Sequence, residues 1–122
     1  MPRLASTFFL TAAVFAVIGM VWGIQMSATH DHTLSPAHGH LNLIGFVITA
    51  VFGAFYALSP AAAESGLARI HYGLHVLAVV VIAPGIAIAI AQENPIFAQI
   101  GSVLALLSMI VFVVVILRSR RI

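Results

Sequence analysis

Four long stretches of this chain contain no charged side chain, and this pattern constrains the fold more than any other feature. Neither Asp, Glu, Lys nor Arg occurs in residues 4–25, 41–59, 70–91 and 96–117. Each stretch has about the 20 residues that a helix needs to cross the ~30 Å hydrocarbon core of a bilayer. The sequence therefore predicts an all-α integral membrane protein with four transmembrane helices, at about 4–25, 38–59, 69–91 and 96–117.

Composition indicates that these helices form one domain. Of the 122 residues, 62% are hydrophobic and 7% are charged, which is more apolar surface than a soluble core of this size can bury. The four spans occupy nearly the whole chain, so residues 1–122 are expected to form a single transmembrane domain. The first apolar run exceeds the ~7–15 residues of a signal-peptide core, and we expect it to be retained.

The basic residues predict how the spans are oriented. All five are arginines, and they precede the first span, lie between the second and third, or follow the fourth: Arg3, Arg69, Arg118, Arg120 and Arg121. In an alternating topology these positions lie on one side, so both termini are expected to be cytoplasmic in a bacterial-type inner membrane. Loops 26–37 and 92–95 then face outward. The basic tail is explained by topology, and no nucleic-acid partner is expected.

Small residues mark the faces on which the helices are expected to pack. Their spacing lets helix backbones approach closely. They are Ala12, Ala16, Gly19 and Gly23 in the first span, Gly45, Thr49 and Gly53 in the second, and Gly101, Ala105 and Ser108 in the fourth.

The second span opens with the candidate site, His38, His40 and Asn42. Ionisable groups inside a membrane are costly, so such a cluster is interpreted first as functional. The chain has no cysteine, which excludes iron–sulfur clusters and c-type haem attachment. Imidazole without thiolate suits haem iron, copper or zinc. For Asn42 and Thr49, hydrogen bonding between packed helices is the alternative interpretation.

Helix geometry predicts that these two histidines do not share a metal. Two residues apart on a helix, His38 and His40 point about 200° away from each other, so each needs a partner from elsewhere. The third span offers none, because His75 rises only about 9 Å above Arg69 and stays roughly 20 Å from the level of His40. A second copy of the chain would complete the site, which favours a homo-oligomer.

The other histidines allow several interpretations. His71 and His75 share a helix face, but the Glu of an H-E-x-x-H zinc motif is missing between them. Their nearness to Arg69 suggests either an interfacial ligand site or a satisfied buried pair. The buried pair is favoured for His75, and the role of His71 stays open. His30 and His32 are expected in a solvated loop, where they could bind a metal adventitiously or relay protons.

The second span resembles a known family. Residues 37–60, with A-H-G-H-L-N-L-I-G-F-V and then F-G-A-F-Y-A-L-S-P, resemble the tenth helix of haem–copper oxidase subunit I, and Ala68-Arg69-Ile70-His71-Tyr72 resembles the start of its eleventh. In that family the two histidines of the tenth helix bind two different haems. The resemblance implies that His38 and His40 are haem ligands. It also implies that this chain is a single four-helix arc, one third of the family's twelve-helix subunit.

The chain departs from the family at its copper site. Adjacent copper-binding histidines would fall in residues 85–91, which contain none, and the cross-linked tyrosine has no counterpart. An oxygen-reducing centre is not expected, and whether the chain is an enzyme stays open.

The resemblance favours a bis-histidine haem b protein for electron transfer or for redox or gas sensing, with an unknown redox partner. In a homotrimer, His38 of one copy would face His40 of the next, and a twofold dimer is the alternative. The other hypothesis is a transport or handling protein for metal ions or protons that uses the histidines without haem.

Overall fold

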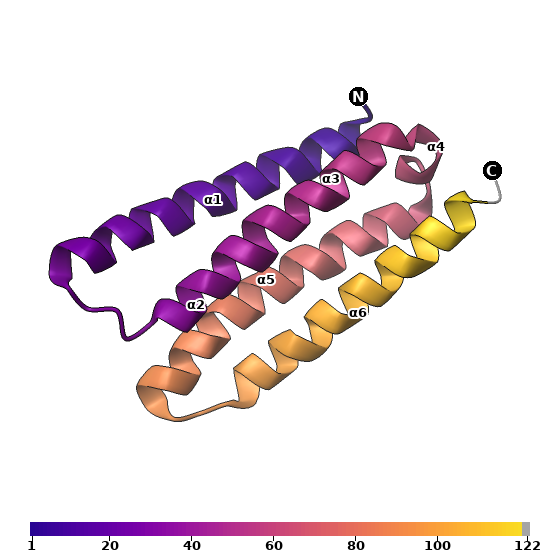
Figure 1. Cartoon of the computed structure of the whole chain (residues 1–122). Helices are drawn as coiled ribbons and strands as arrows, with labels where there is room; N and C mark the ends of the chain where they lie inside the picture. Colours follow the sequence, from indigo (N-terminus) through magenta and orange to yellow (C-terminus); the bar gives the residue numbers. More distant parts are fainter. Residues whose placement is uncertain (121–122) are drawn as a thin grey trace.

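Four long helices form the chain in the computed structural model, which describes residues 1–120 (Figure 1). The first is α1 (Arg3–Thr29), and the last two are α5 (Gly66–Gln92) and α6 (Ile96–Ser119). The second, here called span two, runs over Ser35–Leu58 as α2 (Ser35–His40), a π-helical segment η1 (Leu41–Ile48) and α3 (Thr49–Leu58). All four are long and apolar enough to cross a membrane. The predicted all-helical fold with four candidate spans is confirmed, and residues 1–120 contain no strand.

The helix ends differ from the predicted ones in two places that matter for the site. Helix α1 continues to Thr29, so the loop expected at 26–37 shrinks to residues 30–34. Helix α5 begins at Gly66, because Ser65 caps it: the Ser65 hydroxyl oxygen accepts a hydrogen bond from the backbone N–H of Ala68 at 3.2 Å. The short helix α4 (Pro60–Ala63) fills the connection before this cap.

Glycines set the distance between neighbouring helices. A Cβ on Gly101 of α6 would lie 2.6 Å from the Cα of Ile82 on α5, and a Cβ on Gly53 would lie 3.2 Å from the Cβ of Phe8 on α1. Such contacts are possible only because the glycines carry no side chain. The small-residue positions predicted for close packing therefore include true helix contacts.

An aromatic cluster fills the core near the end of the bundle that holds the chain termini. Phe8 and Tyr56 stack with ring centroids 5.3 Å apart, and Phe52 meets Phe8 edge-on at 6.1 Å. Phe52 also packs on Phe112 of α6 at 4.5 Å. Rings from α1, α3 and α6 thus meet in one cluster.

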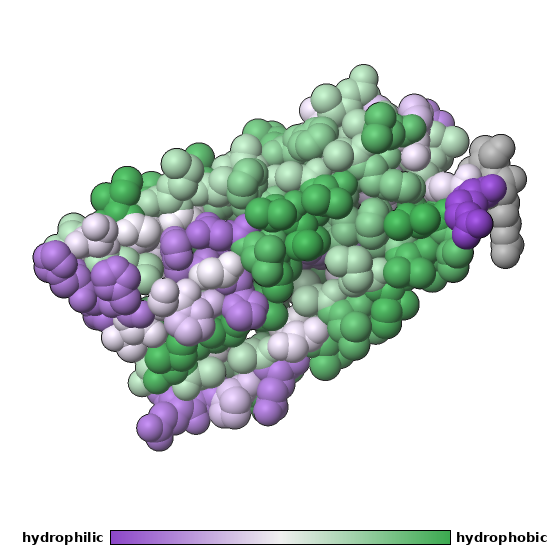
Figure 2. Space-filling model, viewed as in Figure 1, coloured by the Kyte–Doolittle hydropathy of each residue, from purple (hydrophilic) through white to green (hydrophobic). Residues whose placement is uncertain are grey.

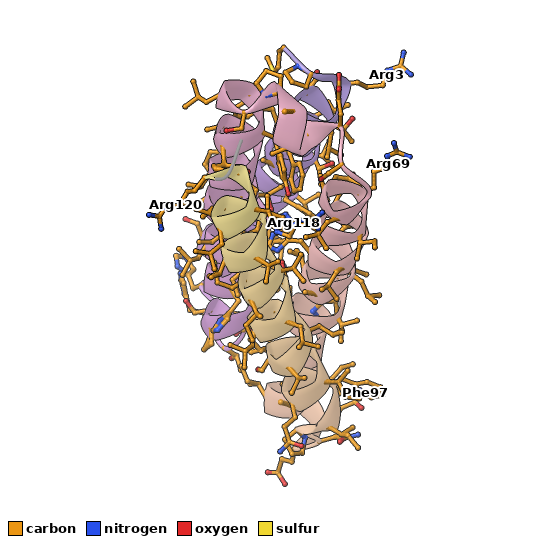
Figure 3. The ribbon with its side chains drawn as sticks, turned by 90° about the vertical axis from the view of Figure 1, so that its right-hand side faces the viewer. Arg3, Arg69, Phe97, Arg118 and Arg120 are labelled. Carbon is orange, nitrogen blue, oxygen red and sulfur yellow. The ribbon has the colours of Figure 1, made fainter. Side chains whose placement is uncertain are left out.

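On the face that Figure 2 shows, the surface is mostly apolar along the middle of the bundle and more polar toward its ends. Both described ends of the chain reach the same end of the bundle (Figure 1). Arg3, Arg69, Arg118 and Arg120 lie toward that end, and Phe97 lies toward the other (Figure 3). Asp31 and Glu93 belong to the two connections at the far end. The two ends of the molecule therefore differ in charge, as the arginine pattern predicts.

Candidate functional site

His38 lies half-buried near the start of span two and points to α1. Its Nε2 donates a hydrogen bond to the backbone carbonyl of Gly19 at 2.8 Å, since a carbonyl can only accept. The indole of Trp22 meets the imidazole edge-on, with ring centroids 5.7 Å apart. A Cβ on Gly23 would lie 3.2 Å from this Nε2. Gly19 of α1 thus provides the acceptor for His38, and Gly23 leaves the space for its ring.

Asn42 lies one turn after His38 on the same side of span two. Its carboxamide occupies the space beside Gly19, where a Cβ would overlap the Asn42 Oδ1. The Asn42 Nδ2 lies 3.3 Å from the His38 Nε2. With Nε2 protonated both of these nitrogens are donors, so the hydrogen bond to α1 comes from His38, and Asn42 packs beside it against Gly19.

His40 is half-buried and bonds along its own helix. Its Nδ1 donates to the backbone carbonyl of Pro36 at 2.8 Å. In the neutral ring this tautomer leaves the Nε2 lone pair unprotonated. His38 and His40 thus have separate partners, as their predicted 200° separation requires, and His40 keeps the nitrogen that a metal would bind.

His75 lies in the middle of the bundle, not near the cytoplasmic surface as the sequence suggested. Because α5 starts at Gly66, His75 lies about 14 Å along the helix and is level with Thr49. The predicted gap of roughly 20 Å to His40 was therefore too large. His75 contacts Ile44 and Thr49, which lie roughly 6 and 14 Å along span two from His40. The error came from measuring from Arg69 and not from the start of the helix.

Both ring nitrogens of His75 have partners on other helices. The Nε2 lies 3.1 Å from the Ile44 carbonyl and 2.9 Å from the Thr49 hydroxyl, so Nε2 carries the proton. In the neutral ring Nδ1 then accepts from the Ser108 hydroxyl at 2.9 Å. One buried imidazole thus joins span two, α5 and α6. His75 is therefore a satisfied buried histidine, the interpretation that the sequence favoured for it, whereas Ser108, assigned to packing, is a hydrogen-bond partner.

The π-helical segment η1 supplies one of these acceptors. The Ile44 carbonyl receives both the Thr49 hydroxyl at 3.1 Å and the His75 Nε2. A π-helix is wider than an α-helix, and such segments occur frequently at functional sites. Here the widened turn follows directly after His40 and contacts His75.

His71 lies fully buried one turn before His75. Its Nδ1 lies 2.9 Å from the Tyr56 hydroxyl, while its Nε2 has no hydrogen-bond partner among the described residues. Aromatic rings surround it: the Phe52 ring centroid is 4.4 Å away and the Phe112 ring stacks on it at 5.5 Å. The sequence left its role open, and the structure gives it one polar contact inside an aromatic cage.

The loop between α1 and span two is exposed and locally ordered. The Thr33 hydroxyl and backbone N–H donate to the Asp31 Oδ1 at 2.6 and 3.0 Å. These two hydrogen bonds, the hydroxyl bond most of all, lower the pKa of Asp31. His30 and His32, on either side, are exposed as expected. Residues 1–120 hold no group of three or more His, Cys, Asp or Glu side chains placed to bind one metal ion.

These features define a class, an all-helical protein with four helices suited to a membrane and with buried histidines in the bundle. Comparison of the sequence and structure with protein families, curated proteins and solved structures finds no match.

Proposed function

We propose that this chain is a membrane b-type haem protein, with His40 as an axial ligand, that works in electron transfer or in redox or gas sensing. The hydrogen bond from the His40 Nδ1 to the Pro36 carbonyl carries this proposal. Haem and metal ligands are typically imidazoles of this kind, since a bond at one nitrogen fixes the ring and leaves the other nitrogen for the metal. When bound, haem b would supply one-electron redox chemistry or a binding position for a gas.

The surroundings of His40 fit a flat apolar group shared with another chain. Leu43, Phe46 and Val47 follow His40 on span two and are exposed, at 55%, 42% and 44%. A porphyrin against this face needs cover on its other side, and a second copy of the chain would provide it together with a second histidine. The resemblance to one arc of a three-arc subunit favours a homotrimer.

In that trimer His38 of the next copy would be the second ligand. For its Nε2 to bind iron, His38 would first have to release its hydrogen bond to Gly19, which costs about 1 kcal/mol net. Asn42, beside it, would position the ring. A twofold dimer would instead use His40 from both copies and leave His38 on α1. The two assemblies therefore assign different roles to His38.

The arginine distribution supports an orientation for this site. With the arginine-bearing end in the cytoplasm, both termini are cytoplasmic and His38 and His40 lie near the outer surface of an inner membrane.

A spectrum of the purified protein tests the haem proposal. Wild-type protein is expected to be red, with a Soret band and a pyridine haemochrome of haem b. His40→Ala should abolish or alter the Soret band and leave the helix content unchanged. His32→Ala, at an exposed loop histidine, is the matched control and should keep the wild-type spectrum. A colourless wild-type protein, or a His40→Ala spectrum equal to that of wild type, would contradict the proposal.

The second candidate function is proton or metal-ion handling without haem. The buried histidines favour it, because His71 keeps a nitrogen without a partner and His75 joins three helices in the bundle core. Intramembrane ionisable residues often mark ion or proton pathways. A colourless preparation with stoichiometric zinc or copper, or proton flux in proteoliposomes that His75→Ala abolishes, would favour this function over haem binding.

A further inference from the structure

Two arginines lie at one hollow at the arginine-bearing end of the bundle. The hollow has a volume of about 390 Å³, and α1, α4 and the start of α5 contribute to its lining. Arg3, Thr7 and Arg69 line it together with Ala63 and Glu64. In Figure 3 the side chains of Arg3 and Arg69 project from the same side of the ribbon, away from it.

The charged side chains at this hollow favour a ligand with one negative charge. Arg3 and Arg69 contribute two positive charges and Glu64 one negative charge, which leaves a net charge of +1. The N-termini of α1 and α5 lie at the same end and add positive partial charge. Guanidinium groups bind phosphate oxygens with paired hydrogen bonds. A phosphodiester, which carries one negative charge, matches this balance.

The surface next to the hollow is apolar. Ile70 follows Arg69 directly and is 62% exposed, and Leu77 lies two turns further on the same helix face, at 51%. On α1, Leu10 follows Arg3 by two turns and is 67% exposed. A molecule that binds with its phosphate between the arginines would therefore extend its remaining part along apolar side chains of the protein.

We propose that Arg3 and Arg69 bind the phosphodiester of an anionic phospholipid in this hollow, with its acyl chains along Ile70, Leu77 and Leu10. Basic pockets at the cytoplasmic side of membrane helices bind such headgroups in other proteins. The site is separate from the histidines and does not depend on the proposed haem function.

Native mass spectrometry of detergent-purified protein with added phosphatidylglycerol tests this site, because membrane orientation plays no part in it. Wild-type protein should retain one lipid per chain. Arg3→Gln/Arg69→Gln should bind it on the order of 30-fold more weakly, and Arg3→Lys/Arg69→Lys should recover part of the binding. The control Arg118→Gln/Arg120→Gln removes the same charge at the same end and should bind like wild type. Circular dichroism checks that each variant is folded.

Three results would overturn the proposal. Lipid retention by Arg3→Gln/Arg69→Gln equal to wild type would remove the site. An equal loss in the control variant would show a general effect of charge. Binding of glycerol 3-phosphate as tight as that of the lipid would show a site for soluble phosphate esters.

Discussion

The Nδ1 of His75 lies 2.9 Å from the Ser108 hydroxyl oxygen, and both side chains are buried, with exposed fractions of 2% and 0%. This bond joins α5 to α6 in the middle of the bundle. Since the Nε2 of the same ring bonds to span two, the relationship fixes the tautomer of His75 and holds three helices in register.

Ser108→Ala is expected to destabilise the protein by about 1–2 kcal/mol, because it leaves the His75 Nδ1 buried without a donor. Thermal unfolding in detergent measures the change. Ser102→Ala is the matched control on α6, since the Ser102 hydroxyl is exposed and bonds to the Ala98 carbonyl of its own helix. Equal melting temperatures for the two variants would contradict the assigned role of Ser108.

Thr49→Val should cost less than Ser108→Ala, about 0.5 kcal/mol. Valine keeps the shape of threonine, and the Ile44 carbonyl still accepts the proton on the His75 Nε2. The same unfolding assay ranks the two variants. A larger loss in Thr49→Val than in Ser108→Ala would indicate that Nδ1, not Nε2, carries the proton.

Gly101→Ala should weaken the packing of α5 on α6 and destabilise the protein by about 1–3 kcal/mol. A Cβ at this position would lie 2.6 Å from the backbone of Ile82, which cannot move aside cheaply. Gly73→Ala on α5 is the control, since a Cβ there meets nothing within 4 Å. That variant should be stabilised by about 0.5–1 kcal/mol through helix propensity. Equal effects of the two substitutions would argue against a close contact at Gly101.

The long helices could be predicted because charge-free stretches of membrane length leave few other folds. The opposite directions of His38 and His40 also follow from helical periodicity. The partners of these histidines could not be predicted in the same way. The acceptors for His38, His40 and one bond of His75 are backbone carbonyls, which carry no side-chain signal in a sequence.

The start of α5 and the π-helical turn were missed for a different reason. The capping role of Ser65 moves the helix start by three residues from the predicted 69 and shifts the height of every residue after it. The π-helical segment η1 carries the Ile44 carbonyl that the His75 Nε2 of α5 contacts. The cap is a local hydrogen bond and the contact at η1 joins two helices, and hydropathy describes neither.

Single cysteines should report the orientation of the helices, because the natural chain has none. With cytoplasmic termini, Asn94→Cys in the exposed α5–α6 connection should react with a membrane-impermeant maleimide in intact cells. Ala61→Cys in α4 is exposed at the other end of the bundle and should react only after the cells are opened. The reverse pattern of labelling would contradict cytoplasmic termini.

The number of subunits and the role of His38 are predicted together. In the proposed homotrimer each haem lies between His40 of one copy and His38 of the next, so a closed ring carries up to three haems. His38→Ala should then remove or alter the Soret band as strongly as His40→Ala. It should also lower the melting temperature, because it removes the bond to the Gly19 carbonyl and the contact with Trp22.

Native mass spectrometry in detergent counts subunits and haems in the same particle. Two subunits with one haem, together with a wild-type spectrum of His38→Ala, would establish the twofold dimer and leave His38 as a structural contact between span two and α1. A monomer that carries haem would contradict both assemblies, because His40 would then need its second ligand from within the same chain.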